Sequence, residues 1–171
     1  MALLLGQDMN NISDMEAIKA KLKTLRPNLL KFWKSGAELS SLFATEEVWI
    51  SDFWRGRVNN LSKEGHPIKY TQPKEGSVVW VDAMDIPKDA RHRRAAEAFI
   101  DFALSKEVHT NFVTNFTYAP CSDWVELTEE QRDLTGARPE ILSNVKFQDP
   151  DYLLKNRDAW NQIMNELMSG M

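Results

Sequence analysis

The stretch Pro73-Lys74-Glu75-Gly76-Ser77-Val78-Val79-Trp80-Val81-Asp82-Ala83-Met84-Asp85-Ile86-Pro87 decides how the rest of the chain is interpreted. Its first four residues are typical of a tight turn, in which Gly76 can take the positive φ that such turns often need. The β-branched and apolar run over 77–86 then predicts a strand, which Pro87 ends. Side chains two positions apart on a strand point the same way, so Trp80 and Asp82 are expected to share one face.

This pair supplies the two chemical groups that bind an organic ammonium ion. The face of an indole ring attracts cationic groups, and a carboxylate forms a charge-assisted hydrogen bond with the ammonium. A carboxylate on a mostly apolar strand also needs a partner or a wet cavity. The alternative is structural: Trp80 packs in a core and Asp82 caps the next turn. The residues alone leave both interpretations open.

Composition limits the function classes. The chain has 171 residues, 43% of them hydrophobic and 27% charged, which is enough for one substantial core of ordinary globular type. The formal net charge of -4 argues against nucleic acid as a partner and is compatible with a cationic ligand. The densest basic patch, 88–94, is expected to be the solvated start of a helix.

The sequence contains no recognisable catalytic or metal-binding motif. The three histidines fit no metal-ligand spacing, and the single cysteine, Cys121, has no pattern of a thiol nucleophile around it. Phosphate-binding, dinucleotide-binding and hydrolase motifs are missing as well. We therefore predict that the protein is not an enzyme and has no catalytic residue, metal site or cofactor.

Helix and strand patterns alternate along the chain, which predicts an α/β fold with a parallel or mixed sheet. The first expected helix is capped by Ser13, with Glu16 as the partner in a capping box, and ends before Pro27. Further helices are expected over 37–44, 53–64, 90–104, 106–115 and 153–168, and strands over 29–33, 47–51, 67–72 and 77–86.

Trp54 lies at the expected helix start directly after the strand 47–51. In open α/β sheets, ligands bind beyond the carboxyl ends of the strands, and this rule makes Trp54 a candidate ligand residue. The alternative is that Trp54 packs at the sheet edge.

Five segments follow one another in an order that is informative as a set. They are the loop Gly6-Gln7-Asp8-Met9-Asn10-Asn11, the turn within 47–56 that contains Trp54 and Gly56, the stretch 73–87, the helix 95–102, and the turn Thr117-Tyr118-Ala119-Pro120. Together they resemble the spermidine/putrescine-binding proteins that serve ABC importers. The resemblance covers nearly the whole chain.

The resemblance implies a fold and a division of the chain. It implies the second lobe of a periplasmic-binding-protein-like α/β fold, with a mixed sheet flanked by helices, plus a partial segment of the first lobe. We expect second-lobe structure over 1–76, a hinge crossing and partial first lobe over 77–126, and a return to the second lobe with the C-terminal helix over 127–171.

The resemblance also implies a binding site. Asp82 would pair with a ligand ammonium group, Trp54 and Trp80 would stack on its methylene chain, and Tyr118 would add an aromatic wall. Asn165 matches a hydrogen-bonding glutamine of the family. For Tyr118, the residues alone also allow a surface aromatic in a turn.

Function and location follow as expectations. The resemblance implies capture of putrescine or spermidine between two lobes, with an ABC permease of the inner membrane as partner and a periplasmic location for a full-length parent. Complete family members are considerably longer, and we find no signal peptide in this chain, so we expect a C-terminal fragment. The alternatives are another cationic solute or a non-binding structural fragment, and a homodimer or segment exchange is expected for the chain alone.

Overall fold

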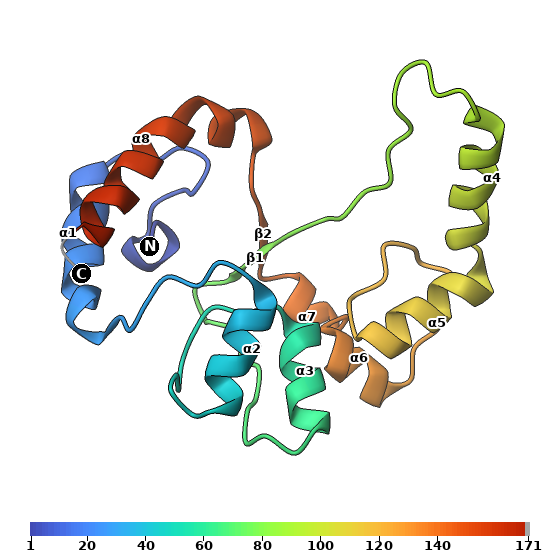
Figure 1. Cartoon of the computed structure of the whole chain (residues 1–171), viewed down its shortest axis with the longest axis horizontal. Helices are drawn as coiled ribbons and strands as arrows, with labels where there is room; N and C mark the ends of the chain where they lie inside the picture. The colour runs from blue at the N-terminus through green and yellow to red at the C-terminus, as the bar shows by residue number, and fades with distance from the viewer. Residues whose placement is uncertain (170–171) are drawn as a thin grey trace. The chain divides into compact units, whose positions relative to one another are not determined.

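The structure is a computed structural model that describes residues 1–169, and the chain packs into two compact units (Figure 1). Unit 1 consists of Met1–Phe32, Gln72–Trp80 and the C-terminal part of the chain from Asn144. Unit 2 consists of Trp33–Thr71 and Val81–Ser143. The α/β class predicted from the alternating patterns is confirmed.

Unit 1 pairs two helices and a small parallel sheet. It contains η1 (Leu3–Leu5), α1 (Met15–Leu25), η2 (Arg26–Asn28), β1 (Ser77–Val79), β2 (Val145–Phe147) and α8 (Pro150–Met168). The two strands are parallel, with Ser77 opposite Val145 and Val79 opposite Phe147. The apolar stripes of the helices bury Ile18 of α1 and Ile163 and Leu167 of α8.

Unit 2 is helical. It contains α2 (Gly36–Ala44), α3 (Arg55–Lys63), α4 (Arg93–Ala103), α5 (Lys106–Phe116), α6 (Glu129–Thr135) and α7 (Pro139–Leu142). Helix α3 packs against α2 and α6, and α5 packs against α4 and α6. The most deeply buried apolar side chains are those of Leu39, Val58, Leu61, Val113 and Val125. Helix α3 contributes two of these side chains, Val58 and Leu61.

Caps and turns in the structure follow from local sequence signals. Thr128 caps α6 and forms a reciprocal capping box with Gln131, and Gly6 closes the first helical turn with φ 69°. Gly76 takes φ 104° in the turn before β1, as expected. The predicted cap of α1 was wrong by one residue: the Asp14 carboxylate accepts from the N–H of Ala17, whereas Ser13 bonds to Gln7.

The predicted strands were mostly wrong. Within residues 1–169 the only strands are β1 and β2, so 29–33, 47–51 and 67–72 form no strand, and the strand expected over 77–86 ends at Val79. A strand needs a neighbour to satisfy its N–H and C=O groups, and these segments have none. Ile50, within the strand expected over 47–51, is 91% exposed.

The two units are built from different stretches than the predicted segments 1–76, 77–126 and 127–171. Residues 33–71 pack with 81–143 rather than with 1–32. The assignment of those three segments to lobes stays a prediction.

Candidate ligand-binding site

Trp54 stands at the N-terminus of α3 as its N-cap residue. Its ring meets the ring of Trp33 edge-on, with centroids 5.3 Å apart, and lies 6.0 Å from the ring of Phe53. Gly36, the first residue of α2, makes room for it, because a Cβ there would lie 2.8 Å from Cζ3 of Trp54. Trp54 nevertheless remains 45% exposed, so it is held by packing and still offers a surface to a solute.

Tyr118 lies against the first turn of the same helix. A Cβ on Gly56 would come within 2.8 Å of Cζ of Tyr118 and 2.6 Å of the carbonyl oxygen of Phe116, so only glycine permits this approach. Thr117 is buried in the left-handed region at φ 55° and accepts a hydrogen bond from the Asn59 side chain over 3.0 Å. Helix α3 thus positions both Trp54 and Tyr118.

A polar and aromatic cluster beside Trp54 was missed by sequence reasoning. The indole N–H of Trp33 donates to Oδ1 of Asp52 over 3.3 Å, and Phe43 stacks on Phe53 with centroids 5.9 Å apart. Trp33 and Asp52 are 19 residues apart, so no local pattern joins them. The unusual number of tryptophans, six in 171 residues, was the only sequence signal of such a cluster.

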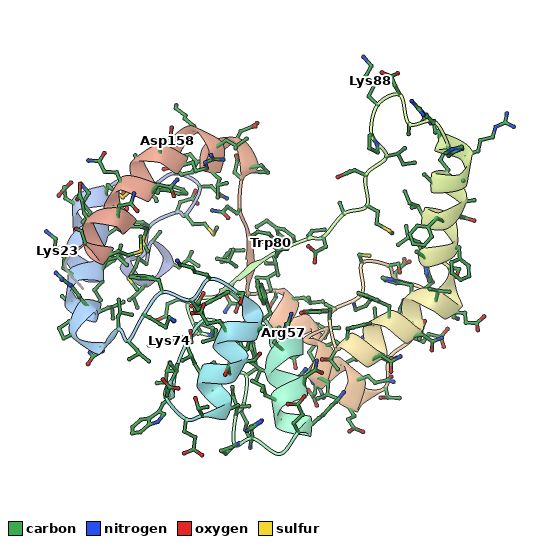
Figure 2. The ribbon with its side chains drawn as sticks, in the orientation of Figure 1. Lys23, Arg57, Lys74, Trp80, Lys88 and Asp158 are labelled. Carbon is green, nitrogen blue, oxygen red and sulfur yellow. The ribbon has the colours of Figure 1, made fainter. Side chains whose placement is uncertain are left out.

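Trp80 and Asp82 follow β1 rather than lying within it. Because the strand ends at Val79, the argument that they share a strand face does not hold. Trp80 is 76% exposed, so the alternative that it is a core residue is wrong as well (Figure 2). Asp82 is also exposed, in the extended segment that leads toward α4. Their roles in ligand binding stay predictions.

Asn165 lies on the exposed side of α8, in unit 1. It lines an open hollow of about 470 Å³ together with other residues of this helix and its C-cap, namely Asp158, Asn161, Gln162, Glu166 and Ser169. All six side chains come from one helix end, so the hollow is a polar surface depression. The role of Asn165 as a hydrogen-bonding ligand residue stays a prediction.

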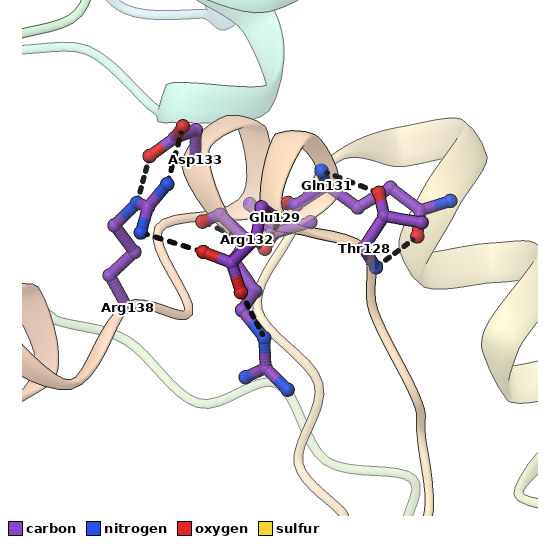
Figure 3. Close-up of polar contacts among 7 residues, drawn as sticks. Thr128, Glu129, Gln131, Arg132, Asp133 and Arg138 are labelled. Carbon is purple, nitrogen blue, oxygen red and sulfur yellow. Dashed lines mark hydrogen bonds and ion pairs between the residues drawn. The ribbon is translucent and has the colours of Figure 1, made fainter.

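A network of charged groups lies on α6 and on the residues that follow it (Figure 3). It is joined to α3 through Arg55. Arg138 donates to both carboxylate oxygens of Asp133 and, over 3.0 Å, to Glu129. The hydrogen bonds from Arg138 lower the pKa of the Asp133 carboxyl, and the same pairing raises the pKa of Arg138. Arg55 of α3 donates to the backbone carbonyl of Asp133 over 3.3 Å.

Arg55 is a structural rather than a ligand residue. Its guanidinium lies 4.1 Å from the ring centroid of Tyr70, and burial lowers its pKa. A cation held on an aromatic ring and on a helix carbonyl fixes the orientation of the first turn of α3.

The described residues 1–169 contain no cluster of three or more His, Cys, Asp or Glu side chains that could hold a metal ion. In the same part of the chain, no helix is both long and apolar enough to cross a membrane.

Comparison with known protein families identifies the family of the chain. The profile of the bacterial extracellular solute-binding proteins matches residues 1–138. The chain belongs to this family.

Two curated relatives indicate which branch of the solute-binding proteins it resembles. It is 32% identical to spermidine/putrescine-binding periplasmic protein 1 of Haemophilus influenzae, over 86% of this chain and 42% of that protein. It is 30% identical to the gamma-aminobutyric acid-binding protein of Pseudomonas aeruginosa, over 85% of this chain and 41% of that protein. The chain therefore spans less than half the length of these relatives.

A solved structure supports the fold. The crystal structure of an ABC transporter from Clostridium perfringens superposes with a TM-score of 0.75 and 24% sequence identity, covering 98% of this chain and 52% of that one. The resemblance to spermidine/putrescine-binding proteins found in the sequence is confirmed at the level of the family.

Proposed function

We propose that this chain carries part of the ligand site of a solute-binding protein that delivers small organic ammonium compounds to an ABC importer. The observation that carries the proposal is the surface formed by Trp33 and Trp54 beside the carboxylate of Asp52. Aromatic faces attract the methylene-ammonium groups of such solutes, and a nearby carboxylate pairs with the charge. Polyamines are among the candidates, because the Haemophilus relative is named for spermidine and putrescine.

The sequence-predicted residues take their roles within this proposal. Asp82 pairs with an ammonium group of the solute, and Trp54 and Trp80 stack on its methylene chain. Tyr118 provides a further aromatic wall, and Asn165 accepts or donates a hydrogen bond at the amine.

Two relatives support the solute class rather than one solute. Spermidine, putrescine and gamma-aminobutyric acid, the solutes in the relatives' names, all carry an ammonium group on a short methylene chain. A periplasmic location and an inner-membrane permease as partner are part of the same proposal. The protein would bind its solute by closing two lobes around it, and the permease would recognise the closed state.

The experiment is a titration of the 171-residue chain with spermidine and putrescine up to tens of millimolar, followed by tryptophan fluorescence. Butane-1,4-diol, which has the chain of putrescine without charge, is the control ligand. We expect saturable changes with the amines only, and at high concentration, because lobe contacts that this chain does not span cannot contribute.

Tryptophan variants show which residue gives the fluorescence change. Trp54→Phe should remove most of the change, whereas Trp124→Phe, an exposed tryptophan outside the proposed site, should preserve it. If no amine produces a saturable change, the alternative of a non-binding structural fragment is correct.

A further inference from the structure

Arg57 is a charged residue of α3 (Figure 2), and its side chain lies close to Trp54 of the same aromatic surface. A Cβ on Gly36 would lie 3.3 Å from Nε of Arg57 and 2.8 Å from the ring of Trp54, so both side chains pack over the same residue of α2. Arg57 is exposed, and within residues 1–169 its guanidinium makes no hydrogen bond or ion pair. The carboxylate of Glu38 in α2 accepts the backbone N–H of Lys34 over 2.7 Å.

The carboxylate of Asp52 is hydrogen-bonded to the indole of Trp33, the second tryptophan of this surface. It accepts hydrogen bonds from the side chains of Trp33 and Ser51, at 3.3 and 3.4 Å, and in the described part of the chain no basic side chain is paired with it. Asp52 and Arg57 do not form an ion pair with each other either. The Trp33–Trp54 surface therefore has an acceptor for a cation near one ring and a donor for an anion near the other.

This arrangement separates two kinds of ammonium compound. A diamine places a cation at both ends, and one end would meet the like charge of Arg57. A compound with an ammonium at one end and a carboxylate at the other meets the opposite charge at both ends. A guanidinium also matches a carboxylate geometrically, because it donates two parallel N–H groups.

We infer that the solute bound at this surface is a short ω-amino acid, whose carboxylate Arg57 binds and whose ammonium group lies toward Asp52. The inference rests on the proposed function, since it names the class of ammonium compound taken by the same site. Arg57 is then the residue that sets specificity between ω-amino acids and diamines.

The test compares γ-aminobutyrate with putrescine, because each has an ammonium on a four-carbon chain and they differ at the other end. Both are titrated into the 171-residue chain, and the dissociation constants are read from the NMR shifts of the tryptophan indole N–H groups. We expect γ-aminobutyrate to bind more tightly than putrescine. Arg57→Gln should move the ratio of the two constants toward putrescine by about three- to tenfold, the range of a partly exposed charge pair.

Two further variants make the outcome specific. Lys63→Gln removes one positive charge from the other end of α3 and should leave the ratio unchanged. Arg57→Lys keeps the charge without the planar fork and should fall between wild type and Arg57→Gln. It also keeps the test valid if Arg57→Gln fails to fold.

The failures of the two proposals can be told apart. If putrescine binds and neither Arg57 variant changes the ratio, the inference about Arg57 is wrong and the proposed function stands. If neither compound shifts any indole signal, the proposed function fails, and the inference fails with it.

Discussion

At the residue scale, the candidate site depends on two glycines that leave room for neighbouring aromatic side chains. Gly36 and Gly56 stand at helix starts, and each leaves space that a neighbouring aromatic ring fills, Trp54 over the first and Tyr118 over the second. Both aromatic residues thus occupy fixed positions while part of each ring faces outward, with Tyr118 38% exposed. Fixed and partly exposed rings lose little conformational entropy when a solute binds.

Asp82 gives the first residue-scale prediction. Asp82→Asn removes a charge from an exposed side chain, so the fold should be unaffected, and binding of an ammonium solute should weaken by about 1.5 kcal/mol or roughly tenfold. Isothermal titration with putrescine measures the change. Asp85→Asn, an equally exposed carboxylate three residues further on, is the matched control. Equal affinities for the two variants would remove Asp82 from the site.

At the element scale, helix α3 positions the candidate site, and Gly56 is the residue on which its packing depends. In Gly56→Ala the new methyl group would lie 2.6 Å from the carbonyl oxygen of Phe116, a backbone atom that cannot move aside cheaply. We expect a loss of about 1–3 kcal/mol from this overpacking, larger than the gain of roughly 0.5–1 kcal/mol in helix propensity.

Urea unfolding curves measure this prediction. Ser62→Ala on the exposed side of α3 is the control and should change the free energy of unfolding by less than about 0.5 kcal/mol. A Gly56→Ala protein of wild-type stability would mean that the 116–118 turn does not pack on α3 as described.

The charged network behind α3 gives a pH dependence. The pKa of Asp133 is lowered in the folded protein, mainly by hydrogen bonds from Arg138, so the pair stabilises the fold above the ordinary carboxyl pKa. That contribution is lost as the pH falls through the lowered pKa. Asp133→Asn should therefore reduce the thermal midpoint at pH 7, and the difference from wild type should shrink in acid. A difference that stays constant down to pH 2 would contradict this role.

At the element scale, the sequence predicted the helices better than the strands. The helices were predicted because apolar residues at helical spacing are a local signal. The strands failed because a run such as 47–51 becomes a strand only if another strand lies beside it. Trp54 and Tyr118 were proposed as ligand residues from the family resemblance, and this role stays a prediction. The Trp33–Asp52 hydrogen bond joins distant positions without any sequence motif.

At the scale of the whole molecule, the open question is what covers α4. This helix buries none of its residues, and Phe99 and Phe102 are each 62% exposed. Sheet β1–β2 has only two strands and so leaves open edges within the described residues. Exposed apolar faces and open edges both favour association with another chain.

We predict that the 171-residue chain forms a homodimer at micromolar concentration, through α4 or by exchange of the 83–125 segment. Phe99 and Phe102 are three residues apart and share one side of α4, so a second copy can cover both rings with one face. Light scattering should give twice the chain mass of 19.7 kDa.

Phe99→Gln with Phe102→Gln should return the monomer, whereas Leu154→Gln, an exposed apolar residue of α8, should not. A wild-type monomer that unfolds in one cooperative transition would show that α4 needs no partner, and would also contradict the lobe boundaries expected near residues 77 and 127.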